Sequence, residues 1–299
     1  MNNAILATRG IQTAFTLRSE GRSPAFMPVS REIPSDGAFE DYLFDEHGFQ
    51  ITEKTSKEDR KKVQELAKKY KLTVRNKSWT GNIAMDKDDY DDANAIVPGY
   101  IDGKINEAVD DFTILPDKLI HDMLVANPNA FDGTAIFADT HNLNTAAAFD
   151  NNLSQTGTTE ANIRTDLPLA YNPIIGVQWS DGKPINPLGI GKWYVICPSI
   201  LELTFRSIVS NPQTSTGVAN IWYNAFGIIV NPYQLNSNTG WYMCYVRAGR
   251  EPFFIQKRKA PVWSFKDDPE DSDYKWISDS RSNVAPAWFT SIVRVGTCG

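Results

Sequence analysis

Cysteine is scarce in this sequence, and its scarcity excludes two common ways of stabilising or equipping a fold. Only three of the 299 residues are cysteine, namely Cys197, Cys244 and Cys298. They are widely separated and form no CxxC pair, so the sequence predicts neither a disulfide framework nor a zinc site. We expect all three thiols to be reduced.

Long hydrophobic runs are also missing. The longest nearly apolar segment, residues 221–230, is interrupted by Asn224 and is far shorter than the roughly 20 residues that span a bilayer. The first 15 residues carry one arginine and no continuous apolar stretch, unlike a secretory signal peptide. We therefore expect a soluble protein that is not exported by a standard signal and has no membrane partner.

The chain has no surplus of positive charge. It contains 30 Lys and Arg against 36 Asp and Glu, which gives a formal net charge of -6. Proteins that bind nucleic acid do so mainly through Lys and Arg side chains that contact the phosphates. Sequence-specific nucleic-acid binding is therefore excluded as the main role. The hydrophobic fraction of 41% is that of an ordinary folded protein, and eight tryptophans favour either a β-rich core or an interaction protein.

Catalytic motifs are equally hard to find. The three histidines, His47, His121 and His141, form no HExxH motif. Asp139 and His141 are the right residue types for a catalytic pair, but no G-x-S-x-G elbow or activated cysteine supplies a nucleophile. We interpret this pair as a source of hydrogen bonds in a loop, and we predict no catalytic residues.

Neither cofactor nor metal binding is predicted. Residues 188–192 offer two glycines of a dinucleotide-binding motif, but the third position is Tyr194 and a strand follows where a helix should begin. The acidic runs 86–92 and 267–273 lack the spacing of a calcium-binding loop. We expect both runs to be solvated loops.

Hydrophobic periodicity predicts a chain with few helices and many strands. Residues 1–50 lack periodicity and contain several prolines, which is typical of an extended arm that a neighbour must order. The apolar stripe of residues 101–124 predicts a long helix that Pro116 either divides or kinks. Residues 131–191 are rich in Asn, Thr, Gly and Pro, and only short strands are expected there.

The remaining elements follow from the same patterns. For the helix at 199–209 we expect Ile200, Leu201, Phe205 and Ile208 to face inward. A charged amphipathic helix is expected at 56–71, and strands are expected at 72–85, 193–197, 228–230, 241–246, 253–256, 261–265, 274–277 and 288–295. The predicted fold class is α+β.

Several short sequence segments, in the same order along the chain, resemble the Mu-like prophage major head subunit family, of the gpT type. Two strand-like stretches separated by Asn-Lys precede an acidic run. The segment Pro-Phe-Phe-Ile-Gln-Lys-Arg-Lys-Ala-Pro lies near the C-terminal end of the sequence. The segments that carry the resemblance are 70–79, 83–92, 131–141, 181–184, 188–201, 241–243, 252–261 and 278–283. The sequence departs from the family pattern at 142–175 and at 284–286.

The resemblance implies the HK97-like phage capsid fold. It assigns five segments: an N-terminal arm (1–46), an extended loop with a short helix and a hairpin (47–98), a spine helix with the peripheral domain (99–191), an axial domain (192–250) and strands returning to the peripheral domain (251–299). Deleting residues 1–45 is then expected to leave a folded subunit that assembles poorly. Lys77, in the loop, is a candidate for covalent cross-linking by location only.

The resemblance also implies a function. It predicts a major capsid protein that self-assembles through hexamers and pentamers into an icosahedral shell, without enzymatic activity or cofactor. The shell would enclose double-stranded DNA, contacted non-specifically, in the virion after assembly in the host bacterial cytoplasm. Portal, scaffold and decoration proteins are candidate partners. The alternatives are an encapsulin-like nanocompartment shell, a secreted β-rich carbohydrate-binding protein and a hydrolase that uses His141.

Overall fold

Two long antiparallel strands near the end of the chain, β9 (Phe253–Asp268) and β10 (Asp273–Pro286), form the centre of a four-stranded sheet. On one side β1 (Ser30–Pro34) pairs with β9 in parallel, and on the other β4 (Lys77–Asp86) pairs with β10 antiparallel. The computed structural model describes residues 12–20, 22–45, 68–88, 100–214, 217–268 and 273–298. Both edge strands of this sheet therefore come from the first third of the chain.

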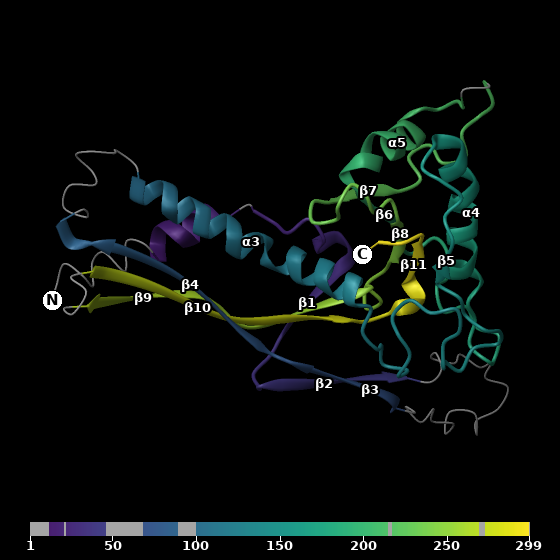
Figure 1. Cartoon of the computed structure of the whole chain (residues 1–299). Coiled ribbons are helices and arrows are strands. Elements are labelled where there is room, and N and C mark those ends of the chain that lie inside the picture. The colour runs from purple at the N-terminus through teal and green to yellow at the C-terminus, as the bar shows by residue number, and fades with distance from the viewer. Residues whose placement is uncertain are drawn as a thin grey trace.

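The long helix α3 (Tyr100–Ala126) runs along one face of this sheet (Figure 1). Pro116 lies inside it, so the apolar stripes before and after the proline belong to one continuous helix. Val109 of α3 is fully buried against Trp263 of β9 and Trp276 of β10. Within the described ranges, no helix has the length and apolar character needed to cross a bilayer.

The second large sheet lies at the other end of the molecule. Its strand order is β5-β11-β8-β6-β7, and helices α4 and α5 lie beside it (Figure 1). The sheet and the arm formed by α3 and the long sheet give the molecule an L-shaped outline in this view. The elements are β5 (Asn152–Leu153), α4 (Glu160–Gly176), β6 (Lys192–Pro198), α5 (Ser199–Ser210), β7 (Gly227–Asn231), β8 (Trp241–Val246) and β11 (Ile292–Val295).

Helix α4 was not expected, because its segment contains Pro168 and Pro173 and is rich in polar residues. Each proline in a helix interior costs about 3 kcal/mol. Four apolar side chains at helical spacing are fully buried, namely Ile163, Leu167, Ala170 and Ile174. The three larger ones contribute roughly 1.5–3 kcal/mol each. Thr159 caps the helix by accepting a hydrogen bond from the amide of Asn162. Burial and capping thus outweigh the prolines.

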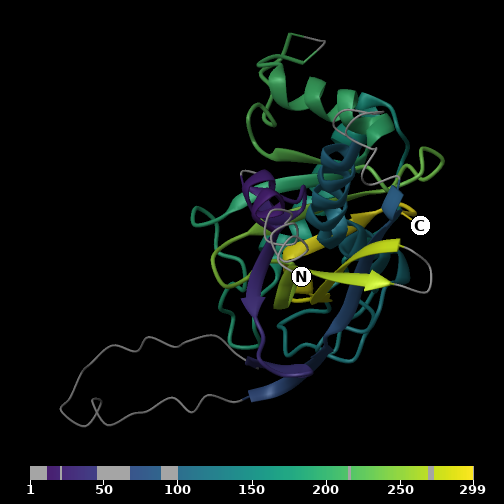
Figure 2. The ribbon, with the colours of Figure 1, turned by 90° about the vertical axis from the view of Figure 1, so that its left-hand side faces the viewer.

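A two-stranded hairpin, β2 (Phe39–Asp45) with β3 (Lys68–Arg75), lies beneath the junction of the two large sheets (Figures 1 and 2). The helix expected at 56–71 is wrong for residues 68–71, which belong to β3 and pair with β2. Its earlier residues lie outside the described ranges. The β-strand prediction for 72–85 is confirmed by β3 and β4.

The N-terminal segment is ordered by its own chain, which corrects the expectation of a loose arm. Residues 12–19 are helical, and a 3-10 turn (Met27–Val29) leads into β1. Phe26 and Val29 are fully buried, and Phe44 is nearly so. These buried side chains belong to the main core, which argues against removing the whole of residues 1–45 without loss of folding; the deletion itself stays a prediction. Residues 1–11 lie outside the described ranges.

The other predicted elements need three adjustments. Residues 253–256 and 261–265 belong to one strand, β9. Residues 289–291 form a 3-10 turn (Phe289–Ser291), and only β11 after it is extended. Ile200 of α5 is 53% exposed, whereas Leu201, Phe205 and Ile208 are buried as predicted. The α+β class and the strands at 193–197, 228–230 and 241–246 are confirmed.

An aromatic cluster holds the three sheets together. Phe44 of the hairpin stacks on Phe131, with ring centroids 4.1 Å apart, and meets Trp288 edge-on at 5.4 Å. Phe131 also packs against Phe289, just before β11. Rings in such pairs contribute about 0.5–1.5 kcal/mol each beyond the area that they bury. The hairpin root, the segment after α3 and the C-terminal strands therefore share one core.

A buried carboxylate fastens the N-terminal segment to α3. The carboxylate oxygens of Asp117 accept hydrogen bonds from the backbone amides of Ala25 at 2.8 Å and Phe26 at 3.0 Å. Burial raises the pKa of Asp117, and the two hydrogen bonds oppose that effect. The bonds hold the chain where Phe26 enters the core.

We expect Asp117→Ala to lower the free energy of unfolding of the unassembled subunit by about 1–3 kcal/mol, because two hydrogen bonds to a charged acceptor are lost. Urea denaturation followed by tryptophan fluorescence measures this. Asp122→Ala is the matched control, since this exposed carboxylate on α3 pairs with the exposed Lys118 and accepts no hydrogen bond from the N-terminal segment among the described residues. The control should change stability by less than about 0.5 kcal/mol. Equal effects of the two substitutions would contradict the assignment.

Candidate functional site

The side chains that the sequence offered for catalysis, His141 and Asp139, form structural contacts. The His141 side chain is fully buried, with Nδ1 3.0 Å from a carboxylate oxygen of Asp132 and Nε2 3.1 Å from the amide oxygen of Asn151. Its ring stacks on Phe289 at 4.1 Å. Asp139, the expected partner, instead accepts a hydrogen bond from Asn152. The structure therefore does not bring Asp139 and His141 together as a pair.

Asn151 is oriented by its other hydrogen bonds, and this orientation turns its amide oxygen toward His141. The amide nitrogen of Asn151 donates to the backbone carbonyls of Ile136, Phe289 and Ile292, so its oxygen must face the histidine as an acceptor. Both ring nitrogens of His141 thus lie within hydrogen-bond distance of an oxygen atom, one from Asp132 and one from Asn151. The pair of His141 and Asp132 is sealed inside the core and joins the segment after α3 to the start of β11.

The other chemical candidates also lack the geometry of a site. Strand β6 begins at Lys192, directly after the glycine pair, so no helix N-terminus is available to hold a phosphate. Cys197, Cys244 and Cys298 are free and buried, and burial raises the pKa of Cys197 to about 12 and that of Cys298 to about 11. Among the described residues no group of three His, Cys, Asp or Glu side chains is placed to hold a metal ion.

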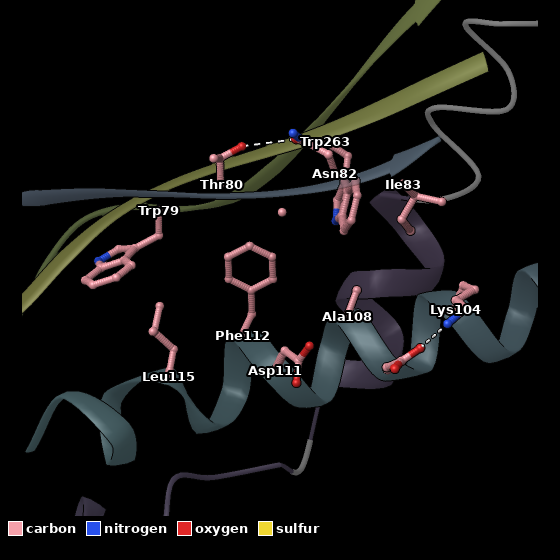
Figure 3. Close-up of a pocket in the computed structure, with 12 residues that line it drawn as sticks. Trp79, Thr80, Asn82, Ile83, Lys104, Ala108, Asp111, Phe112, Leu115 and Trp263 are labelled. Atoms are coloured by element: carbon pink, nitrogen blue, oxygen red, sulfur yellow. Dashed lines mark hydrogen bonds and ion pairs between the residues drawn. The ribbon is translucent and has the colours of Figure 1, made fainter. Parts of the chain in front are cut away.

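One cleft of about 370 Å³ lies between α3 and β4 (Figure 3). Phe112 projects from α3 between Trp79 and Trp263, and Lys104 is occupied by an ion pair with Glu107 at 2.7 Å. The described residues that line the cleft include no histidine, cysteine or serine. The cleft therefore combines an apolar wall, which includes Trp79, Phe112 and Trp263, with a few polar and charged side chains from α3 and β4.

Exposed apolar side chains are concentrated instead on the outer surface of the second sheet. Leu203, in the middle of α5, is 78% exposed, and Ile221, in the loop after α5, is 80% exposed. We define the α5 surface as the exposed apolar residues on α5, on the loop after it and on the loop between β7 and β8, which a hydrogen bond from Ser199 to Asn236 joins to the start of α5: Ile200, Leu203, Val218, Ile221, Tyr223 and Leu235. Single exposed apolar residues are common, but a group of this kind marks an interaction surface.

The hairpin presents a second exposed surface. Phe39 and Leu43 lie on the same face of β2 and are each more than half exposed. The opposite face anchors the hairpin, because the Tyr42 hydroxyl donates to the Gln256 side chain at 2.8 Å and Phe44 enters the core. Burial, with the nearby Glu40 carboxylate, raises the pKa of Tyr42 to about 12. The hairpin is thus fixed at its root and exposed on one side.

His121 connects α3 to the second sheet. The amide oxygen of Asn231 accepts from the Tyr233 backbone, so its nitrogen donates to Nδ1 of His121 at 3.1 Å. Nδ1 must then be unprotonated. Burial, the largest cause, lowers the pKa of His121, which agrees with this role as an acceptor. His121 thus acts as a neutral hydrogen-bond acceptor between α3 and the second sheet.

We expect His141→Leu to lower the free energy of unfolding by about 1–3 kcal/mol, because the buried side chains of Asp132 and Asn151 each lose a hydrogen-bond partner. The double variant Asp132→Asn/His141→Leu should lose less than the sum of the two single changes. Chemical denaturation of the unassembled subunits completes this cycle. Additive losses would show that the two side chains do not act as a pair.

We expect the subunit to lose stability as the pH falls below 6.5, the ordinary value for histidine, since the folded state favours neutral His121. This contribution is fully present above 6.5 and is lost as the proton displaces the hydrogen bond from Asn231. The measurement is the free energy of unfolding against pH for the natural chain and for His121→Gln. An unchanged pH slope in the variant would refute the assignment.

Comparison with known proteins identifies the family. Residues 5–183 match the family described as Mu-like prophage major head subunit gpT. No curated protein matches the sequence. The structure is similar to a chain of the procapsid of bacteriophage JBD30, with a TM-score of 0.53, 16% identity, and coverage of 99% of this chain and 76% of that one.

Two further solved structures have the same fold. A chain of the capsid of a native GTA particle is similar with a TM-score of 0.58 and 10% identity, covering 92% of this chain and 90% of that one. A virus-like particle from Pyrococcus furiosus is similar with a TM-score of 0.57 and 9% identity, covering 95% and 97%. The chain belongs to the Mu-like prophage major head subunit (gpT) family and, with the HK97-like fold, is a major capsid protein of the kind that forms an icosahedral shell.

Proposed function

We propose that copies of this chain assemble, through hexamers and pentamers, into a closed shell that encloses double-stranded phage DNA. The observation that carries the proposal is the match to major head subunits over residues 5–183. The physical arrangement supports it, since chemically capable residues are buried in structural contacts while apolar residues are exposed on α5 and on the hairpin. The proposed role of this chain is to bind copies of itself.

Each part of the fold then has a role in the shell. We assign residues 1–46 to the N-terminal arm, 47–98 to the extended loop, 99–191 to the spine helix and peripheral domain, 192–250 to the axial domain and 251–299 to returning strands. β9 and β10 run along the spine helix α3, in keeping with the peripheral assignment. β11 pairs with β8 and β5 pairs with β11, so the axial sheet also takes short strands from the segments 251–299 and 99–191.

The α5 surface is the proposed contact between copies around each five-fold or six-fold axis. It belongs to the axial segment and presents exposed apolar groups at both ends of α5 and at its centre. Specific interfaces bury about 800 Å² per partner, so several modest contacts per subunit are enough for a shell. In a closed lattice each added contact forms at high effective concentration, which multiplies weak contacts into a stable assembly.

The acidity of the chain suits a container for DNA. A net charge of -6 lets a shell enclose phosphates without binding them tightly. Buried free thiols fit assembly in a reducing host cytoplasm. Portal, scaffold and decoration proteins are further partners of this assembly. A nanocompartment with protein cargo is the alternative, and nuclease-protected DNA inside purified shells decides between the two.

Size-exclusion chromatography with negative-stain microscopy tests the proposal directly. We expect the purified chain to form uniform closed shells with a mass far above that of the 33.5 kDa subunit. The arrangement of exposed apolar surfaces accounts for this result, because they leave water only when copies meet. A compact monomer at high concentration under native conditions would refute the proposal.

We expect Leu203→Asp/Ile221→Asp to prevent shell formation while leaving the subunit folded. Both side chains are at least 78% exposed, so the unassembled subunit should lose less than about 0.5 kcal/mol of stability. In an interface each charge would be buried without a partner. Lys183→Glu, in a loop outside the α5 surface, is the control for added negative charge. Normal shells from the double variant would exclude the α5 surface as a contact.

A further inference from the structure

A polar pocket of about 700 Å³ lies where the end of α3 meets the second sheet. Three segments that are distant in the sequence form its walls: β5 and the residues after it, the loop between β7 and β8, and β11 with the residues after it. Val125 near the end of α3 and Thr297 near the C-terminus both line the pocket, and Figure 1 shows these two parts of the chain close together. The pocket is thus a product of the whole fold.

The charge in this pocket is positive. The chain carries 36 Asp and Glu, but none lies among the described residues that line the pocket. Among those residues Arg294 alone is charged, and most of the others carry a hydroxyl or an amide group. The hydroxyls of Ser154, Ser237 and Thr297 form no hydrogen bond with any described residue. The pocket therefore presents polar groups around a single cation.

The guanidinium group of Arg294 is held in a fixed orientation. Its Nε and Nη2 atoms donate to the amide oxygen of Asn152 at 3.0 and 2.7 Å, and its centre lies 5.0 Å from the centre of the Phe137 ring. Asn152 is itself oriented, because its amide nitrogen donates to Asp139 at 3.1 Å. The remaining nitrogen of Arg294, Nη1, has no partner among the described residues.

The positive charge of Arg294 is not neutralised within the described part of the subunit. Arg294 forms no ion pair with a described carboxylate, and Asp139 contacts Asn152 in place of the arginine. Asp139 thus orients the arginine through an amide without meeting it directly. A guanidinium group with an unpaired N–H edge suits an oxyanion, since its donors match the spacing of carboxylate or phosphate oxygens.

The walls of the pocket are joined by hydrogen bonds. The Gln155 side chain donates to the backbone oxygen of Thr239 at 3.0 Å and accepts from its hydroxyl at 3.2 Å. The amide of Gly296 donates to the backbone oxygen of Leu153 at 2.8 Å. Gly296 has a φ of +80°, and a Cβ atom there would lie 2.8 Å from Gln155. The shape of the pocket is therefore formed before any ligand binds, which reduces the cost of binding.

The residue types in the pocket indicate the class of ligand. Arginine, serine, threonine, asparagine and glutamine are among the side chains that contact the phosphates and sugars of nucleic acid, and each of these five types lines the pocket. A phosphodiester carries one negative charge, which matches the single guanidinium, and its sugar adds oxygen atoms for the hydroxyl and amide groups. A carboxylate matches the charge but offers only two oxygen atoms. The chemistry therefore favours a sugar with its phosphate.

We propose that this pocket binds a phosphate and its attached sugar from the backbone of the DNA that the shell encloses. The inference rests on the proposed function and deepens it, because it names the place where each copy contacts the DNA. One phosphate held through one arginine is a weak contact, in keeping with the acidity of the chain. The many copies in a shell make such contacts at the same time, so their number holds the DNA.

Binding of a labelled short duplex DNA to unassembled subunits, followed by fluorescence anisotropy over a series of salt concentrations, tests the pocket. We expect Arg294→Gln to weaken binding about tenfold and to reduce the slope of log affinity against log salt by about one, because one phosphate contact is lost. Arg294→Lys keeps the charge, so it should keep most of the slope while it loses affinity. Equal affinities of the natural chain and Arg294→Gln would overturn the inference, as would no binding by the natural chain.

A second variant avoids the contacts that Arg294 makes within the fold. Ser237 is exposed and its hydroxyl has no partner among the described residues, so Ser237→Asp adds a carboxylate to the pocket without removing a contact. It should weaken DNA binding roughly fivefold, since like charges a few ångströms apart repel. Ser180→Asp, at an exposed serine in a loop outside the pocket, is the matched control and should bind like the natural chain. Thermal unfolding confirms that each variant is folded, and equal binding by the two serine variants would contradict the proposal.

Two further probes, inorganic phosphate and an oligoglutamate peptide at matched ionic strength, distinguish the source of the anion. We expect duplex DNA to bind more tightly than either, in a manner that depends on Arg294. Binding of inorganic phosphate alone would overturn the assignment to DNA. Arg294-dependent binding of the peptide as tight as that of DNA would assign the pocket to an acidic protein segment instead. Failure of the natural chain to form closed shells would overturn the proposed function, whereas duplex binding by subunits is measured without shells.

Discussion

Burial of aromatic rings at the junction of the three sheets is the constraint on which the rest of the structure depends. Phe44 comes from the hairpin, Phe131 from the segment after α3, and Phe289 from the turn before β11. The buried pair of His141 and Asp132 lies against the same rings. Because residues from so many parts of the chain meet here, the hairpin, the long arm and the axial sheet have fixed relative positions, which a subunit must have to tile a shell.

What remains outside this core is what the subunit uses to meet its neighbours. The α5 surface keeps Leu203 and Ile221 in water, and the hairpin keeps Phe39 and Leu43 there. The long sheet carries exposed charged side chains, such as Lys259 and Asp279. These surfaces divide the labour, since apolar contacts supply most of the association energy while charges favour the correct orientation. A shell needs both kinds of contact. Its contacts must be strong when added together, but each one must be able to break and form again when two subunits meet in a wrong orientation.

Sequence patterns predicted local elements well where periodicity and end signals agreed. The stripe of α3 continued past Pro116, and Pro198 before α5 marked a strand-to-helix transition. Helix α4 was missed although Thr159 and the spacing of Ile163, Leu167 and Ala170 carried the signal, because its prolines were given more weight. Exposure of Ile200, the contact of Asp132 with His141 and the placement of Asn152 beside Arg294 depend on tertiary packing, which one sequence does not display.

The topology of the long sheet has a consequence for the order of events during synthesis. Its edge strands β1 and β4 are made early, whereas its central strands β9 and β10 belong to the last fifth of the chain. The edges therefore emerge from the ribosome more than 160 residues before their partners. Pairing at such separations is slow and leaves strand edges open to other chains. A nascent subunit thus depends on protection from premature pairing until translation is nearly complete.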